Sequence, residues 1–265
     1  MKNLLFLVVI SFFFSCNSSV KKESTSIEKE PKWVSLFNGK DLTGWTPKFN
    51  KSEFGQNFNN TFQVKDGVIK VDYGAYETFD REFGHLFYKD KFSHYRLKVE
   101  YRFTGEQVEN GPGWAFKNSG IMFHCQNPET MLVDQEFPVC IEAQFLGGNG
   151  TDERSTLNLC TPSTNVFMED TLTTIHCINS DSKTFHGEQW VKAEILVLGD
   201  SLVRHYVNGE QVMEYQKLQI GGDYLPEGYP DLEGTPVTSG YISLQAESHP
   251  VEFRTVEILD LSGGH

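Results

Sequence analysis

The stretch "VCIEAQFLGG" (Val139–Gly148) alternates apolar and polar side chains and then ends at two glycines. Successive side chains of a β-strand point to opposite faces of the sheet, so the alternation predicts a strand with one buried face. The residues of that apolar face are Val139, Ile141, Ala143 and Phe145. Glu142 and Gln144 then lie on the opposite face, where they are either solvated or part of a site.

Similar alternating runs recur along the chain, and there is almost no helical periodicity. Gly, Asn, Asp and Pro separate the runs, as is typical of turns between short strands. Three pairs have the residues of tight hairpin turns: Asp66-Gly67, Gly199-Asp200 and Asn208-Gly209. Because no crossover helices are expected, we predict an all-β sandwich of two antiparallel sheets over residues 32–265.

The N-terminus has the pattern of an exported protein. Residues 1–15 place Lys2 before an apolar run that is too short to span a bilayer, which indicates a signal peptide. Cys16 follows directly, as the lipidated cysteine of a bacterial lipoprotein does, although ordinary secretion is an alternative. Residues 16–31 are polar and predict a disordered tether. We therefore expect a cell-envelope protein, anchored through Cys16 alone, that faces the periplasm or the exterior.

The charge of the chain disfavours nucleic acid as a partner. The net charge is −13, and the sequence has no basic cluster outside Lys21 and Lys22. Few side chains are therefore available to neutralise phosphates.

Four cysteines remain if Cys16 carries lipid, and an exported chain permits disulfides between them. Cys160 and Cys177 flank one segment, which favours a bridge that closes a loop there. The pairing of Cys125 and Cys140 stays open. The spacings match no zinc template.

Polar side chains occupy the face away from the core in four predicted strands. An idle, solvated sheet face with cross-strand ion pairs is the alternative, above all for Glu100 with Arg102. Two long insertions, residues 104–117 and 147–183, are candidates for the walls of a cleft. Trp114 in the first insertion is a candidate platform for stacking on a sugar. The polar residues on these strands are Glu100, Arg102, His124, Glu142, Gln144, Gln245 and Glu247.

Conventional glycoside hydrolysis needs two carboxyl groups that flank the scissile bond. The strand that would carry them has only Glu142, followed by Gln144. The sequence also has no nucleophile elbow and no phosphate-binding loop. This argues against an ordinary endo-glycosidase, which remains an alternative.

Several motifs together resemble one family, the 3-keto-disaccharide hydrolase domains. They are "SLFNGKDLTGW" (35–45), "LKVEYRF" (97–103), "NSGIMFH" (118–124), "IEAQFLGG" (141–148), "HYVNGE" (205–210) and "GYISLQAESHPVEFRTVEI" (240–258). The resemblance covers residues 33–261. It implies a concanavalin A-like jelly roll with a sugar-binding concave face. It also implies an exported bacterial protein that acts on 3-keto-glycosides made by a partner oxidoreductase.

The chemistry implied by the resemblance needs a base, an acid and groups that stabilise an enolate. A ketone at C3 acidifies the proton on C2, so the C1 substituent can leave by elimination before water adds. We expect Glu142 or His124 as the base, with the other as the acid. Candidate substrate-binding residues are Gln144, Gln245, Arg102, Glu100, Asn118 and Trp114. Alternatives for proton transfer are Glu247, His249, His205 and His176.

No cofactor is required by these motifs, although a divalent metal such as calcium is compatible with a jelly roll. Asp134, Asp152 and Glu153 are the carboxylates that could contribute oxygens, but no loop has a compelling ligand spacing. The main functional alternative is a carbohydrate-binding envelope lipoprotein without catalysis.

Overall fold

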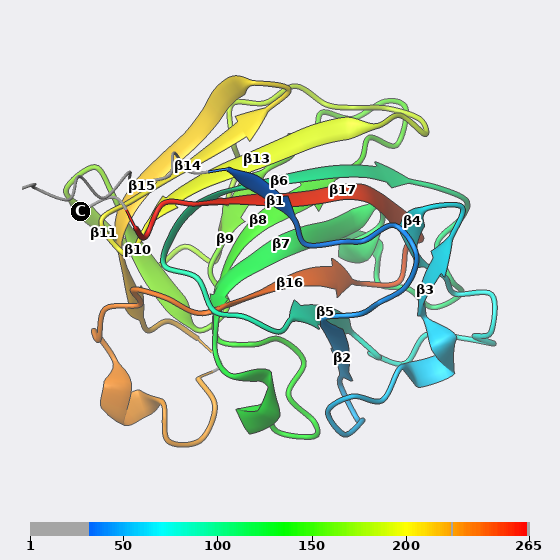
Figure 1. The fold of residues 1–265 in the computed structure, drawn as a ribbon, viewed down its shortest axis with the longest axis horizontal. Coiled ribbons are helices and arrows are strands. Elements are labelled where there is room, and N and C mark those ends of the chain that lie inside the picture. The colour runs from blue at the N-terminus through cyan, green and yellow to red at the C-terminus, as the bar shows by residue number, and fades with distance from the viewer. Residues whose placement is uncertain (1–31, 224, 264–265) are drawn as a thin grey trace, which may run out of the picture. The chain divides into compact units, whose positions relative to one another are not determined.

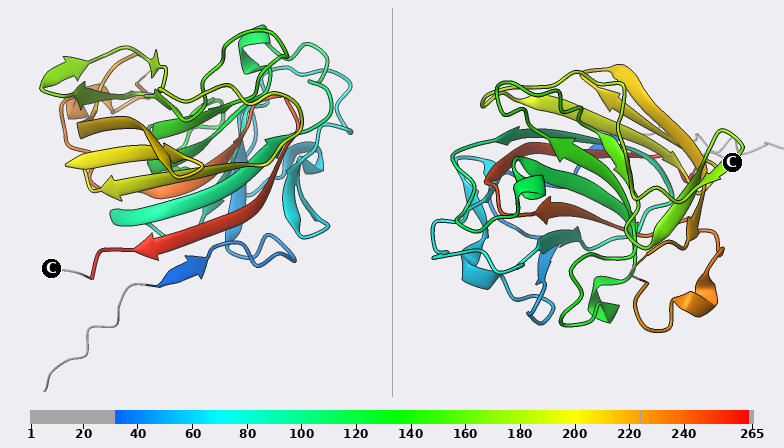
Figure 2. Two further views of the ribbon diagram at one scale, coloured as in Figure 1. Left: turned by 90° about the horizontal axis from the view of Figure 1, so that it is seen from above. Right: turned by 180° about the vertical axis from the view of Figure 1, so that it is seen from behind.

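The computed structural model describes residues 32–223 and 225–263, and within them the chain forms two antiparallel sheets packed face to face. Figure 1 shows β17 and β6 of one sheet in front of β7 and β8 of the other, and Figure 2 gives the two layers from above and from behind. The predicted all-β jelly-roll sandwich is confirmed. The predicted signal peptide, Cys16 and the tether lie outside the described residues.

The described residues place ten strands in one sheet, called the larger sheet here. In spatial order they are β11 (Thr171–Thr173), β10 (Thr164–Met168), β15 (Glu210–Ile220), β14 (Leu202–Val207), β13 (Val191–Leu198), β6 (His94–Phe103), β17 (Val251–Asp260), β4 (Val68–Val71) and β3 (Phe62–Lys65), with β1 (Trp33–Ser35) also paired to β17.

The second, smaller sheet has seven strands within the same ranges. They are β12 (Cys177–Ile178), β9 (Asn158–Cys160), β8 (Ile141–Leu146), β7 (Asn118–Cys125), β16 (Tyr241–Ala246), β5 (Gly84–Tyr88) and β2 (Trp45–Phe49). The 3-10 turns between strands are η1 (Phe58–Asn60), η2 (Gly113–Ala115), η3 (Pro128–Thr130) and η4 (Pro230–Leu232). None of the helices in the described ranges has the length and apolar character that a membrane span requires.

All three predicted hairpin turns are present. Asp66-Gly67 joins β3 to β4, Gly199-Asp200 joins β13 to β14, and Asn208-Gly209 joins β14 to β15. Asp66, Asn208 and the three turn glycines have positive φ angles. Glycine adopts such angles without strain, and Asn and Asp tolerate them better than other residues, which is why these pairs end the strands.

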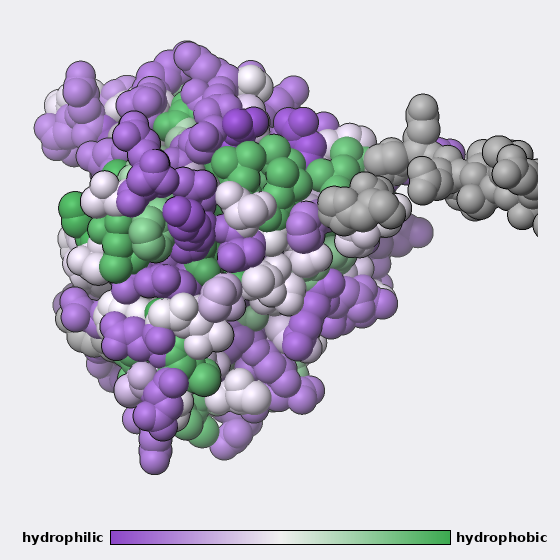
Figure 3. All heavy atoms as spheres, turned by 90° about the vertical axis from the view of Figure 1, so that its left-hand side faces the viewer, coloured by the Kyte–Doolittle hydropathy of each residue, from purple (hydrophilic) through white to green (hydrophobic). Residues whose placement is uncertain are grey.

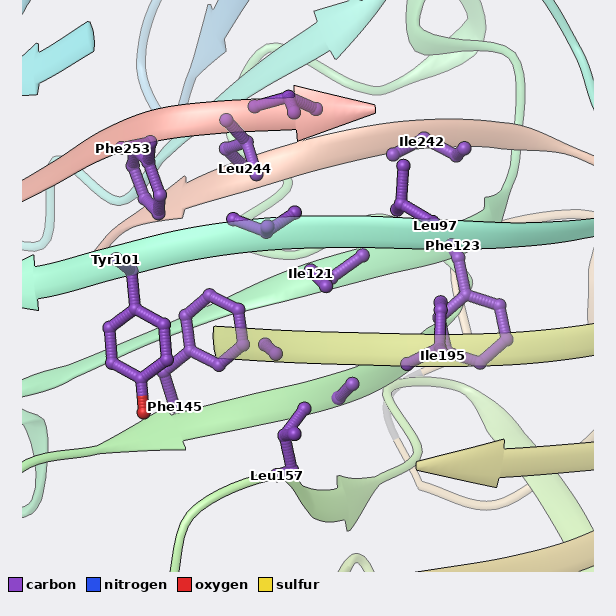
Figure 4. Close-up of a cluster of buried hydrophobic side chains, with 14 of the residues drawn as sticks. Leu97, Tyr101, Ile121, Phe123, Phe145, Leu157, Ile195, Ile242, Leu244 and Phe253 are labelled. Atoms are coloured by element: carbon purple, nitrogen blue, oxygen red, sulfur yellow. The ribbon is translucent and has the colours of Figure 1, made fainter. Parts of the chain in front are cut away.

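The core lies between the sheets and consists of the apolar residues of the alternating runs. Leu97 and Phe253 of the larger sheet face Ile121 and Leu244 of the smaller one (Figure 4). The rings of Tyr101 and Phe145 stack across the interface, with centroids 3.9 Å apart and an interplanar angle of 3°. As predicted, Ile141, Ala143 and Phe145 point into this core, which directs Glu142 and Gln144 to the outer face of the smaller sheet.

The outer face of the larger sheet is an ion-pair surface and does not contribute to a cleft with Glu142. Glu100 pairs with Arg254 at 2.8 Å, and Arg102 pairs with Glu252 at 2.7 Å. Trp190 packs against both guanidinium groups. The two residues expected to bind substrate, Glu100 and Arg102, thus lie on a different sheet from Glu142 and form the cross-strand ion pairs that were the alternative. Alternation identified their polar face correctly, but it carries no information about which sheet a strand joins.

Loops cover the outer face of the smaller sheet, on the side away from the larger sheet (Figure 2, left). The polar residues Lys48, His85 and Gln245 on that face are at most 1% exposed, as a solvated sheet face would not allow. The predicted insertion 147–183 is more ordered than expected, because it contains the strands from β9 to β12. The end of the molecule at the left of Figure 1, near β10, β11 and β15, is mainly hydrophilic with small hydrophobic patches (Figure 3).

Candidate active site

Glu142 lies on the outer face of β8 and packs over the backbone of the neighbouring strand β7. A methyl group built on Gly120 of β7 would lie 2.5 Å from Oε1 of Glu142, so only glycine leaves room for the carboxyl group. Glu142 is 5% exposed, and Oε1 has no hydrogen-bond partner among the described residues. A buried oxygen without a partner marks a site that is completed by a ligand or by water.

Glu247 follows β16 and brings a second carboxyl group to the same place. The amide Nε2 of Gln245 donates a hydrogen bond of 3.0 Å to Oε1 of Glu247, which orients the carboxyl group. Its Oε2 is buried without a partner in the described part of the chain, and Glu247 is only 3% exposed. Thus β8 and β16, which flank β7, supply one carboxyl group each.

Burial sets the protonation of this pair, since neither carboxyl group forms an ion pair with a Lys or Arg of the described ranges. Loss of hydration raises the pKa of Glu142 to about 8. It raises the pKa of Glu247 well above the ordinary range, and the nearby charge of Glu142 raises it further. Two buried, interacting carboxyl groups do not both ionise easily, so the pair retains a proton to higher pH than an isolated Glu would.

Both carboxyl groups line a cavity of about 370 Å³ on the outer face of the smaller sheet. Aromatic residues form one wall: Trp114 is 55% exposed and packs on Phe83, which in turn contacts Phe137. The residues around the cavity are Trp114, Asn118, Phe137, Glu142, Gln144, Cys160, Pro162, His176, Cys177 and Glu247.

A disulfide between Cys160 and Cys177 forms the opposite wall and joins β9 to β12. The bridge predicted from the sequence is confirmed. It holds His176, one residue before Cys177, at the edge of the cavity. Cys125 and Cys140 are free and buried.

Asn118 and Gln144 supply polar contacts inside the cavity. Oδ1 of Asn118 is buried and has no partner within the described residues. Oε1 of Gln144 accepts a hydrogen bond of 3.1 Å from Nδ2 of Asn158, and the NH₂ group of Gln144 has no partner among the described residues. These amides can bind the hydroxyl groups or the carbonyl oxygen of a sugar, as their residue types predicted.

His124 lies on the other side of the smaller sheet and does not line the cavity, contrary to expectation. It has a φ angle of 50°, and the pairing of β16 with β7 shifts register between Tyr241 and Ser243. This bulge reverses the alternation, so Nε2 of His124 lies 3.1 Å from the carbonyl oxygen of Gly199 in the larger sheet. Burial lowers the pKa of His124 to about 4.

Two further histidine candidates also lie away from the cavity. His205 is buried in the larger sheet, where its ring nitrogens contact the carbonyl oxygen of Leu157 and the hydroxyl of Tyr215. His249 is buried, and its ring packs edge-on against Phe103 and Phe116. Burial, with the charges of Lys117 and Arg154, lowers the pKa of His249 to about 4. Of the predicted histidines, His176 alone lines the cavity.

The polar face continues beyond the residues expected from the sequence. In the strand register, His85 of β5 lies between Gln245 of β16 and Lys48 of β2. Burial lowers the pKa of His85 to about 3, so the ring is neutral. Phe137 was missed because it belongs to an irregular connecting segment, where no periodicity assigns a side chain to a face. Lys48 and His85 had a signal, since "WTPKF" and "GHLFY" both place a polar residue opposite core positions.

No group of three or more His, Cys, Asp or Glu side chains is gathered for a metal ion in the described part of the chain. The sequence-based oxygen donors are not brought together. For example, Asp152 accepts a hydrogen bond from Asn149 in its own loop.

Comparison with known proteins places this site in context. The model of a family described as 3-keto-alpha-glucoside-1,2-lyase-like domain matches residues 32–259. A search of curated proteins finds no significant match. Among solved structures, a candidate glycosyl hydrolase from Parabacteroides distasonis is similar at 23% identity and a TM-score of 0.54, with 87% of this chain and 94% of that chain covered.

A Bacillus subtilis protein of unknown function with a galectin-like fold is also similar, at 11% identity and a TM-score of 0.50. The similarity covers 88% of this chain and 96% of that chain. Identities this low show a shared fold alone.

Proposed function

Since the chain belongs to the family of 3-keto-alpha-glucoside-1,2-lyase-like domains, we propose that it cleaves 3-keto-glycosides, such as 3-keto-disaccharides, by elimination followed by addition of water. One observation carries the proposal: two buried carboxyl groups without a cationic partner among the described residues lie together at the floor of a sugar-sized cavity. Burial keeps both pKa values high and gives the two groups different proton affinities.

Glu142 acts as the base, because its Oε1 lies in the cavity over Gly120 without a hydrogen-bond partner among the described residues, whereas Gln245 already orients the carboxyl group of Glu247. Its carboxylate takes the proton from C2, and the C–H electrons form the enolate that the C3 ketone stabilises. The enolate re-forms the ketone as the C1=C2 double bond forms and the C1–O bond breaks. A base with a pKa near the working pH combines a useful ionised fraction with high proton affinity.

Glu247 acts as the acid and gives its proton to the oxygen that leaves C1. Gln245 holds one oxygen of Glu247, so the protonated oxygen is directed away from the amide. The NH₂ group of Gln144 donates to the ketone oxygen, and Oδ1 of Asn118 accepts a hydrogen bond from a neighbouring hydroxyl group. Water then adds to the unsaturated sugar. The route requires an oxidoreductase that makes the C3 ketone beforehand, and we propose such an enzyme as the functional partner.

Conventional hydrolysis through an oxocarbenium ion is less well supported. It needs an ionised carboxylate facing a cationic transition state. Both carboxyl groups here are buried, and burial raises their pKa values above the usual range of Glu. A high proton affinity favours proton abstraction by the ionised fraction of Glu142. A cationic transition state is stabilised better by a carboxylate that is fully ionised at the working pH.

The test is to incubate the protein with a 3-keto-disaccharide and with the unoxidised parent sugar. We expect sugar release from the oxidised compound alone. Glu142→Gln should lower kcat by at least 10²-fold, the usual scale for removal of a general base, while the circular dichroism spectrum is unchanged. Glu214→Gln, at an exposed position on β15, is the matched control and should retain wild-type activity. Binding of both sugars without turnover would support a non-catalytic carbohydrate-binding protein instead.

We also propose that the protein is exported and anchored at the cell envelope through Cys16. The disulfide supports an oxidising compartment, because such bridges are rare in the cytosol. Cys16→Ala should move the protein from the membrane fraction to the soluble fraction. Unchanged fractionation would rule out the lipid anchor.

A further inference from the structure

A second cavity of about 430 Å³ adjoins the first on the outer side of the smaller sheet. The two cavities share three wall residues, Phe137, Pro162 and His176, and so adjoin one another; together they are called the groove here. Each cavity alone lies near the lower end of the roughly 300–1,000 Å³ that small-molecule sites occupy. Together they offer room for two adjoining sugar rings.

The wall of the second cavity is held in place by hydrogen bonds. Nε2 of Gln135 donates to Oε1 of Gln126 and to the carbonyl oxygen of Phe137, each at 2.8 Å. Oε1 of Gln135 accepts from the backbone N–H of Leu132. The segment from Leu132 to Phe137 is thus a preformed wall, which reduces the entropic cost of binding.

The second cavity offers apolar contact on one side and negative charge at its rim. Leu132 is 47% exposed and, with Phe137 and Pro162, presents an apolar surface of the kind that packs against the C–H groups of a sugar ring. Asp134, Glu136 and Asp223 contribute carboxylates. Arg81 is engaged by Glu136 through two hydrogen bonds, so these two charges cancel. Asp134 and Asp223 remain, and the buried ammonium of Lys48 interacts with Asp134 alone of these two.

The keto sugar must occupy the first cavity, where Glu142 and Glu247 lie, so the group attached to C1 extends into the adjoining space. From this geometry we propose that the second cavity is a leaving-group subsite for an uncharged sugar ring, which rejects anionic rings such as uronic acids. Leu132 and Phe137 provide the contact surface, and Asp134 with Asp223 provides the rejection. This inference rests on the proposed function.

The experiment compares three substrates on the full folded chain: a methyl 3-keto-glycoside, a 3-keto-disaccharide with a neutral leaving sugar, and the matching disaccharide with a uronic acid as leaving sugar. Leu132→Ala should lower kcat/KM for the neutral disaccharide by roughly tenfold, the scale of one lost apolar contact, and leave the methyl compound unchanged. Leu172→Ala is the control, because Leu172 is similarly exposed (44%) but lies on β11 and does not line the groove.

Asp134→Lys should raise the ratio of kcat/KM for the uronic acid compound to kcat/KM for the neutral disaccharide by roughly tenfold. The increase should be smaller at high salt, because salt screens the added charge. Asp170→Lys, at an exposed site near β11, should leave that ratio unchanged. If the variants change the methyl compound and the disaccharide equally, or change neither, the subsite is wrong although the cleavage reaction stands. If the wild type cleaves none of the three compounds, the proposed function fails, and the subsite with it.

Discussion

At the floor of the cavity, Glu142 lies where strand β7 has no side chain. Gly120 provides that space, and its φ angle is not positive. The glycine is thus required for the close approach of a carboxyl group and not for a special backbone conformation. A single added methyl group has a clear effect at such a position.

Gly120→Ala should displace the Glu142 carboxyl group and lower kcat/KM by about 10²-fold, since misplacement of a reacting group by about 1 Å has that scale of effect. Stability should fall by roughly 1–3 kcal/mol, as expected of overpacking. Steady-state kinetics and urea denaturation measure the two effects.

Gly113→Ala is the matched control for this prediction, because a methyl group there has no neighbour within 4 Å. Near-wild-type activity of Gly120→Ala would show that the position of Glu142 on β8 is not important for turnover.

At the scale of elements, the cavity depends on connections that the alternating pattern does not describe. The pattern located β8 and the outward direction of Glu142 and Gln144, because a strand buried on one face must alternate. It failed at His124, where a bulge inserts a residue and reverses the faces. Phe137 and Pro162 line the cavity from irregular segments, whose positions depend on long-range contacts and not on local periodicity.

The disulfide between β9 and β12 should matter to both stability and binding. The two cysteines are 17 residues apart, and a loop of that size contributes about 3 kcal/mol through the entropy of the unfolded chain. The double variant Cys160→Ser/Cys177→Ser should lose about this much free energy of unfolding, measured by urea denaturation. KM should rise more than kcat falls, because the bridge forms a wall and takes no part in proton transfer. Wild-type protein treated with reductant should lose the same free energy of unfolding. If neither protein loses stability, the prediction is wrong.

At the scale of the whole molecule, the outer faces of the two sheets differ. The larger sheet carries ion pairs such as Glu100–Arg254 on its outer face, whereas the smaller sheet carries buried polar groups under loops. Fold class, hairpins and the Cys160–Cys177 bridge could be predicted from local sequence. The assignment of Glu100 and Arg102 to the opposite sheet could not, since pairing between distant strands decides it.

Buried ionisable groups should make stability depend on pH, with a maximum near pH 6.5. Four buried histidines have folded-state pKa values lowered to about 3 or 4, so the folded protein binds fewer protons and loses stability as pH falls below 6.5. The pKa of Glu142 is raised to about 8, so this group reduces stability as pH rises from 4.5 through about 8. The pKa of Glu247 is also raised, and it acts in the same direction. Each group changes the free energy of unfolding by at most about 1.4 kcal/mol per pH unit. The four histidines are His85, His124, His205 and His249.

Thermal unfolding between pH 4 and pH 9 measures this profile. Glu142→Gln should flatten the decline above pH 6.5, because one buried carboxyl group no longer ionises. A wild-type stability that keeps rising from pH 6.5 to pH 8 would contradict the assignment of raised pKa values to the pair.

The unpartnered oxygens of Asn118, Glu142 and Glu247 allow ligands of the cavity to be found through their effect on thermal stability. A buried polar atom left without a partner costs about 1–3 kcal/mol, so a ligand that binds here must supply a hydrogen bond to each of the three oxygens. A matching polyol should therefore raise the melting temperature, since a ligand at 100 times its Kd adds about 2.7 kcal/mol to the folded state. Thermal-shift screening of oxidised sugars can thus identify ligands of this cavity before any cleavage assay exists.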